Sequence, residues 1–84
     1  MFEIIWTNKS LLQLDNLDNS ISKRIFKKVE ELKINPFSRD LKRLKKEKAF
    51  RLRVGDYRVA IDVDLKNSII YVLRNGHRKN FYKR

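Results

Sequence analysis

Residues 49–64, AFRLRVGDYRVAIDVD, alternate apolar and polar side chains with a period of two. The alternation is interrupted at Gly55-Asp56, a dipeptide of the kind that closes two-residue β-hairpin turns. Such a hairpin sorts its side chains onto one apolar face and one polar face. The predicted register pairs Val54 with Tyr57, Arg53 with Arg58, Leu52 with Val59, Arg51 with Ala60 and Phe50 with Ile61.

Two helices are predicted upstream of this hairpin. The first spans roughly residues 9–17, and the second runs from Asp18 or Ser20 to about Asn35, where Pro36 stops it. The connection between them is very short, which predicts an antiparallel helical hairpin. The apolar residues of the second helix recur every three or four positions and mark one buried stripe: Ile21, Ile25, Val29 and Leu32.

The remaining segments predict two more strands. Residues 2–6 are apolar on both alternations except at Glu3, which suits a strand inside or beside a sheet rather than an exposed edge. Residues 68–74 follow a Lys66-Asn67 turn and have the pattern of a central strand. Residues 37–48 form a basic connector with room for a short helical turn.

The order strand, helix, helix, strand, strand, strand predicts one small α+β domain over residues 1–84. We expect the two-helix antiparallel hairpin to pack on one face of a mostly antiparallel, four-stranded sheet. Phe2, Trp6 and Phe26 are expected in the core between the two layers. The opposite face of the sheet stays open and carries the arginines of the 49–64 hairpin.

Arg51, Arg53 and Arg58 share this open face, where directly opposed like charges cost stability. One interpretation is a solvated surface with Asp62 and Asp64 as ion-pair partners. The other is a phosphate site, because the planar guanidinium fork suits bidentate contacts with phosphate.

The net charge of the chain limits the kinds of molecule that we expect it to bind. Lys and Arg number 21 against 10 Asp and Glu, a net charge of +11, and all of the excess lies after residue 20. Such a field attracts nucleic acid, acidic protein segments or anionic membrane. There is no cysteine and one histidine, so a disulfide and a zinc-thiolate site are excluded and no metal site is expected. The chain has no membrane-length apolar run and its N-terminus lacks signal-peptide character, so we expect a cytoplasmic protein without membrane contact.

The C-terminal tail brings His77, Arg78, Phe81 and Tyr82 to the end of the last strand, from which it can cross the arginine face. The structural alternatives are an exposed loop histidine and an aromatic clamp on the core. The chain has no glycine-rich phosphate loop and no serine-histidine-aspartate arrangement. Cations with a histidine and a tyrosine suit cleavage of RNA, whose own 2′-hydroxyl is the nucleophile. Proton transfer would fall to Tyr82, His77 or Lys48.

Three segments together resemble the RelE/ParE superfamily of type II toxin-antitoxin toxins, closest to the RelE-type mRNA interferases: SKRIFKKVEELKINP, FRLRVGDYRVAIDV and GHRKNFY. The resemblance covers essentially the whole chain. It implies a metal-independent, cofactor-free endoribonuclease that enters the ribosomal A site and cuts the mRNA codon there. It also implies a cognate RelB-like antitoxin, acidic and helical, that wraps the toxin. Operator DNA would be contacted only indirectly, through the antitoxin complex.

The resemblance also implies roles for individual residues. The catalytic set would be Arg51, Arg58, Arg78 and Tyr82. The resemblance also gives Arg53 a place at the phosphate, and the basic connector and tail themselves add the other expected RNA-binding residues, Lys45, Lys46, Lys48, His77 and Lys79. Well-studied members carry lysines in the first hairpin strand, where this chain has Ala49 and Arg51, so the general base stays open.

Two alternatives remain at this point. The first is a ParE-like or otherwise non-nucleolytic toxin. The ParE branch has the same fold but poisons DNA gyrase, and it lacks the catalytic cluster, so the four retained catalytic residues favour RNA. The second alternative is a basic nucleic-acid-binding module without catalysis.

Overall fold

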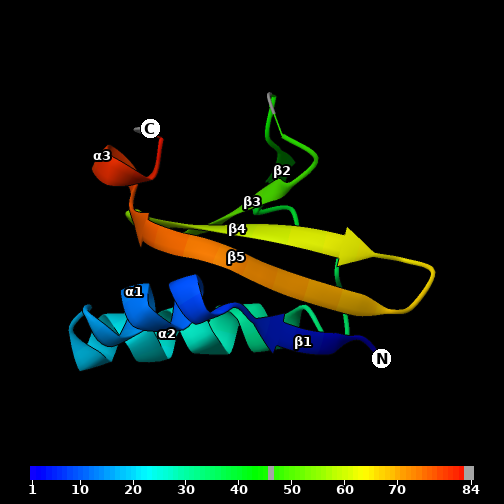
Figure 1. Ribbon diagram of the computed structural model, residues 1–84, viewed down its shortest axis with the longest axis horizontal. Coiled ribbons are helices and arrows are strands. Elements are labelled where there is room, and N and C mark those ends of the chain that lie inside the picture. The colour runs from blue at the N-terminus through cyan, green and yellow to red at the C-terminus, as the bar shows by residue number, and fades with distance from the viewer. Residues whose placement is uncertain (46, 83–84) are drawn as a thin grey trace.

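The structure, a computed structural model, describes residues 1–45 and 47–82. Its elements are β1 (Glu3–Trp6), α1 (Asn8–Asp15), α2 (Asn19–Glu31), β2 (Leu41–Arg43), β3 (Phe50–Val54), β4 (Tyr57–Asp64), β5 (Ile69–His77) and α3 (Arg78–Phe81). The strands form one sheet in the order β1-β5-β4-β3-β2, with β1 parallel to β5 and the other neighbours antiparallel. Helices α1 and α2 cover one face of the sheet, called the inner face here, and α3 lies on the opposite, outer side (Figure 1).

The predicted hairpin is confirmed pair by pair, from Val54 opposite Tyr57 to Phe50 opposite Ile61. Gly55 has a φ of +58° and Asp56 does not have a positive φ, which is the pattern of a type II′ turn. Glycine adopts this backbone conformation without the steric penalty that a Cβ atom brings. The turn therefore fixes the register, and the register decides which side chains face the helices.

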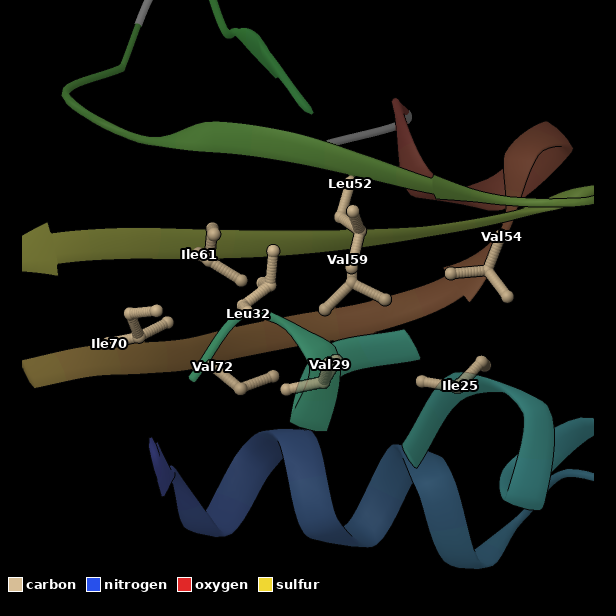
Figure 2. Close-up of a cluster of buried hydrophobic side chains, with 9 residues drawn as sticks. All are labelled: Ile25, Val29, Leu32, Leu52, Val54, Val59, Ile61, Ile70 and Val72. Carbon is tan, nitrogen blue, oxygen red and sulfur yellow. The ribbon is translucent and has the colours of Figure 1, made fainter. Parts of the chain in front are cut away.

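The core lies between α2 and the inner face of the sheet (Figure 2). Its nine residues are at most 6% exposed: Ile25, Val29, Leu32, Leu52, Val54, Val59, Ile61, Ile70 and Val72. Three members of the predicted helical stripe are thus fully buried, and the fourth, Ile21, packs against them while partly exposed. The apolar alternation of the hairpin and the period of the second helix meet in this one cluster.

The helices are shorter than predicted. The Thr7 hydroxyl caps α1 by accepting the backbone N–H of Ser10 at 3.2 Å. Helix α2 ends at Glu31 rather than near Asn35, because its last turn tightens to three-residue spacing and the Lys33 carbonyl accepts the backbone N–H of Phe2. Within the described residues, no helix is long and apolar enough to cross a membrane.

Three details of the architecture differ from the prediction. The basic connector contains a fifth strand, β2, which pairs with β3. Strand β1 is an edge strand, and it is apolar on both alternations because Ile5 lies beside Tyr71 on the outer face. Phe26 is 48% exposed and stacks on Trp6 with ring centroids 5.9 Å apart, so it covers the core rather than joining it. The predicted α+β class, with two helices packed on one face, is confirmed.

Candidate functional site

A row of side chains crosses the outer face from β2 to β5. Lys42 pairs with Arg51, Arg51 with Ala60, and Ala60 with Arg74. Residues paired across neighbouring strands point to the same side of the sheet. Ala60 is fully buried and has only a methyl group, so it separates the two arginines without filling the space between them.

Arg74 reaches the outer face because of a β-bulge. The β4–β5 register shifts between Ala60 and Ile61: Ile61 pairs with Val72 while Ala60 pairs with Arg74, which leaves Leu73 as the extra residue. Without the bulge Arg74 would lie opposite Val59, on the inner face. Arg74 is not among the predicted site residues, because both alternations of this strand are apolar and no residue in them marks the bulge.

Helix α3 brings the C-terminal aromatic residues onto the outer face, as the predicted path of the tail required (Figure 1). His77 is the N-cap of this helix, and its ring Nδ1 accepts the backbone N–H of Lys79 at 3.1 Å. Phe81 is 5% exposed, and the Arg74 guanidinium carbon lies 4.6 Å from its ring centroid. The neighbouring Tyr82 packs edge-on against Phe81 and remains 56% exposed.

Between β2, the β2–β3 connection and α3 lies a cavity of about 500 Å³, called the arginine cavity here. Its described lining residues are Lys42, Arg43, Leu44, Lys45, Glu47, Arg51, Arg74, Phe81 and Tyr82. Five of these lining residues are cationic, and Glu47 is the one acidic residue in the described lining. Three of the predicted site residues line the cavity, namely Arg51, Tyr82 and Lys45. Within residues 1–45 and 47–82, no ion pair or side-chain hydrogen bond involves Arg51.

The other two predicted catalytic residues lie at the β3–β4 turn instead. Arg58 folds back, its Nη1 donating to the carbonyl oxygens of Gly55 at 2.8 Å and Tyr57 at 2.9 Å. Arg78 donates its backbone N–H to the Asp56 carbonyl at 2.8 Å, and its Nε is 3.9 Å from the Asp56 carboxylate. Neither arginine is among the described lining residues of the arginine cavity. The structure therefore separates the predicted catalytic set into two pairs.

Arg53 is held by an ion pair, but its partner is neither of the two aspartates expected in the solvated-surface interpretation. Its Nη2 donates to Asp40 Oδ1 at 2.9 Å, and Lys28 from α2 donates to the other Asp40 oxygen at 2.6 Å. These hydrogen bonds, that from Lys28 first, hold the pKa of the Asp40 carboxyl below its ordinary value of 3.8. Asp64, one of the two expected partners, instead accepts hydrogen bonds from Asn67.

The remaining predicted RNA-binding residues are spread over the surface. Lys48 and Lys79 are exposed, and neither is among the described residues that line the arginine cavity. His77 is half-buried, with its ring edge-on to Tyr57 at 5.3 Å, so its packing and its capping bond are structural contacts. Lys46 lies outside the described residues. Over the same described ranges, no three His, Cys, Asp or Glu side chains gather as a metal site.

A comparison with known proteins shows the family to which the chain belongs. The sequence model described as "ParE toxin of type II toxin-antitoxin system, parDE" matches residues 4–82. The chain belongs to this toxin family. No curated protein matches the chain.

Solved RelE structures share its fold. A chain of the RelBE2 toxin-antitoxin complex from Mycobacterium tuberculosis superposes with a TM-score of 0.82 at 25% identity, and the match covers 92% of this chain and 98% of that one. The RelB-RelE complex from Methanococcus jannaschii gives 0.74 at 28% identity, covering 93% and 94%. The archaeal RelE-RelB complex from Pyrococcus horikoshii gives 0.82 at 24% identity, covering 94% and 97%. The resemblance to the RelE/ParE superfamily is thereby confirmed.

Proposed function

We propose that this toxin is a ribosome-dependent endoribonuclease that cuts mRNA in the A site, with the arginine cavity as its reaction centre. The observation that carries the proposal is the set of five cations around one cavity, with Arg51 unpaired among the described residues and Tyr82 exposed at the rim. A phosphodiester gathers negative charge during cleavage, and preorganised cations stabilise that charge.

Different side chains of the cavity would stabilise charge and transfer protons during cleavage. The RNA 2′-hydroxyl attacks the adjacent phosphorus and loses its proton to a base, while the departing 5′-oxygen gains a proton. The products are a 2′,3′-cyclic phosphate and a 5′-hydroxyl end. Arginine stays protonated and serves as a charge stabiliser, which leaves proton transfer to Tyr82, Lys42 and Lys45. The ribosome would orient the codon so that attack is in line.

Arg58 and Arg78 have a different place in this proposal. They lie at the β3–β4 turn, outside the cavity, where they would contact phosphates that flank the cut and set the path of the strand. Arginine contacts to flanking phosphates raise affinity without entering the bond-breaking step. Loss of either would therefore weaken binding more than the chemical step.

The same positive surface suits an acidic, helical antitoxin of the RelB type. The Mycobacterium and archaeal structures cited above are toxin-antitoxin complexes, and the net charge of +11 calls for a partner that neutralises it. We propose that such an antitoxin binds the toxin in the cytoplasm and covers the arginine cavity. Contact with operator DNA would be made through the antitoxin.

A second function, inhibition of DNA gyrase, is favoured by two observations. The matching sequence model is described as that of the ParE toxin. In addition, Arg58 and Arg78 are separated from the arginine cavity. A gyrase inhibitor would need no proton-transfer group. It would block supercoiling by purified gyrase and leave mRNA intact in a translating extract.

The test is to map mRNA 5′ ends in a translating extract, with naked mRNA alongside. The variants are Tyr82→Phe and the matched Tyr71→Phe, whose tyrosine lies on β5 outside the described cavity lining. We expect cuts inside codons only with ribosomes, unchanged by Tyr71→Phe and slowed about 100-fold by Tyr82→Phe. Absence of cuts, with growth inhibition and gyrase inhibition both present, would replace the nuclease function by the gyrase function.

A further inference from the structure

Glu47, Arg74 and Phe81 line two cavities at once. Besides the arginine cavity, they line a second cavity of about 410 Å³. Its described lining residues are Lys9, Gln13, Glu47, Arg74, Asn75, Gly76, Asn80 and Phe81. Residues common to both cavities form the wall between them. The Glu47–Arg74 ion pair therefore stands at the side of the proposed reaction centre opposite Arg51.

The ion pair has the geometry in which an arginine binds a phosphate. Arg74 Nη1 donates to Glu47 Oε2 at 3.1 Å, and Nη2 donates to Oε1 at 3.2 Å. Two parallel N–H donors facing two oxygens of one anion is the bidentate arrangement that carboxylate and phosphate share. Both side chains are 25% exposed, so a ligand in either cavity can reach the pair.

Arg74 belongs to the sheet, whereas its partner Glu47 belongs to a connection between strands. The Phe81 ring supports the guanidinium plane at 4.6 Å, and the Arg74 backbone is part of β5, which is paired on both sides, with β1 and β4. Glu47 lies in the connection between β2 and β3, outside the strands. The carboxylate can therefore leave the Arg74 fork without a change in the sheet.

We propose that Arg74 is a phosphate-binding residue for RNA and that Glu47 occupies its fork in the free toxin until an RNA phosphate replaces the carboxylate. This rests on the proposed function in taking RNA as the ligand. Arg51 and Arg74 flank Ala60 in one row of the sheet, so a strand that crosses the arginine cavity passes both guanidinium groups. Glu47 then lowers the RNA affinity of the free toxin by competing for one of them.

The test measures affinity of the full chain for a short single-stranded 2′-O-methyl RNA, which cannot be cleaved by 2′-hydroxyl attack. Glu47→Gln removes the competing charge, and Glu3→Gln makes the same charge change at an exposed position of β1. We expect Glu47→Gln to tighten binding about tenfold and Glu3→Gln less than about twofold. The slope of log affinity against log salt should steepen by up to about 0.7 for Glu47→Gln only, because in the wild-type toxin the displaced carboxylate takes up a counterion and offsets the release from one phosphate.

Arg74→Lys, made in the wild-type and Glu47→Gln backgrounds, keeps the charge and removes the fork. We expect it to abolish most of the gain in the Glu47→Gln background and to change wild-type affinity much less. Thermal unfolding of each variant shows that a folded protein is compared. Equal affinities of Glu47→Gln and Glu3→Gln, or a Glu47→Gln affinity that Arg74→Lys leaves unchanged, would overturn the proposal and establish a purely structural ion pair.

This outcome is separable from that of the proposed function. Ribosome-dependent cleavage by a protein whose Glu47→Gln variant binds RNA no more tightly would remove the Arg74 proposal and leave the nuclease. Tighter RNA binding by Glu47→Gln without any cleavage on ribosomes would do the reverse.

Discussion

The two faces of the sheet are built by different means. On the inner face, nine apolar side chains from α2 and its C-cap, β3, β4 and β5 are buried together, and each should tolerate another apolar side chain of similar volume (Figure 2). On the outer face, three arginines each have a different hydrogen-bonding partner. Arg53 is paired with Asp40, Arg74 with Glu47, and Arg58 with backbone carbonyls.

The difference shows where the fold is stabilised and where it is available for a ligand. Burial of apolar area is favourable without specific partners, so the inner face supplies most of the stability. Half-exposed ion pairs add little to stability, so the outer face can exchange its partners at small cost. Substitutions on the inner face should therefore change stability more than substitutions on the outer face.

The largest effect on stability is expected at Leu52, in the middle of the inner face. Leu52→Ala leaves a cavity among fully buried side chains and should lower the free energy of unfolding by about 2–5 kcal/mol. Leu12→Ala is the matched control, because Leu12 is 66% exposed and its loss should cost less than about 0.5 kcal/mol. Urea denaturation measures both. Equal losses would mean that the inner face is not the stabilising layer.

A smaller effect is expected at the β3–β4 turn. Gly55→Ala places a Cβ atom on a residue with a φ of +58° and should cost about 1–2 kcal/mol. In Gly76→Ala the new Cβ meets no atom within 4 Å and the φ is not positive, so stability should change by less than about 0.5 kcal/mol. The two denaturation curves test the turn directly, and a Gly55→Ala protein as stable as wild type would show that the turn does not depend on glycine.

The smallest effect is the acid dependence of the two ion pairs of Asp40, with Arg53 on the outer face and with Lys28 of α2. The lowered pKa of Asp40 means that the folded state gains stability above the ordinary value of 3.8 and loses it as the pH falls through the lower folded pKa. The stability difference between wild type and Asp40→Asn should therefore shrink between pH 6 and pH 3. Asp64 has a lowered pKa in both proteins, so its contribution cancels. A difference that is the same at both pH values would exclude the ion pairs as its source.

The inner face could be predicted because its signals are local. The period-two alternation, the glycine in the turn and the helical spacing of Ile25, Val29 and Leu32 each require only neighbouring residues. Strand β2 could not be predicted in the same way. Its three residues, Leu41–Arg43, carry no complete alternation, and they become a strand only because the free edge of β3 pairs with them.

The outer face could be predicted only in part, because it depends on contacts between distant segments. The register placed Arg51 on that face, and the sequence of the tail indicated that Tyr82 would join it. The bulge at Leu73 turns Arg74 outward, and the β2–β3 connection brings Glu47 to it from 27 positions away. The fold-back of Arg58 onto the turn carbonyls is likewise a matter of side-chain conformation that no spacing encodes.

The central claim is that the arginine cavity is the site of RNA cleavage, and one pair of variants tests it most directly. Arg51 and Arg53 lie on one strand and one face and carry the same charge, but only Arg51 lines the cavity among the described residues, whereas Arg53 is bound to Asp40. The measurement is the single-turnover rate of mRNA cleavage on ribosomes programmed with a defined codon. We predict that Arg51→Ala slows cleavage about 100-fold or more and that Arg53→Ala slows it less than about threefold. Equal losses in the two variants, or a larger loss in Arg53→Ala, would contradict the account.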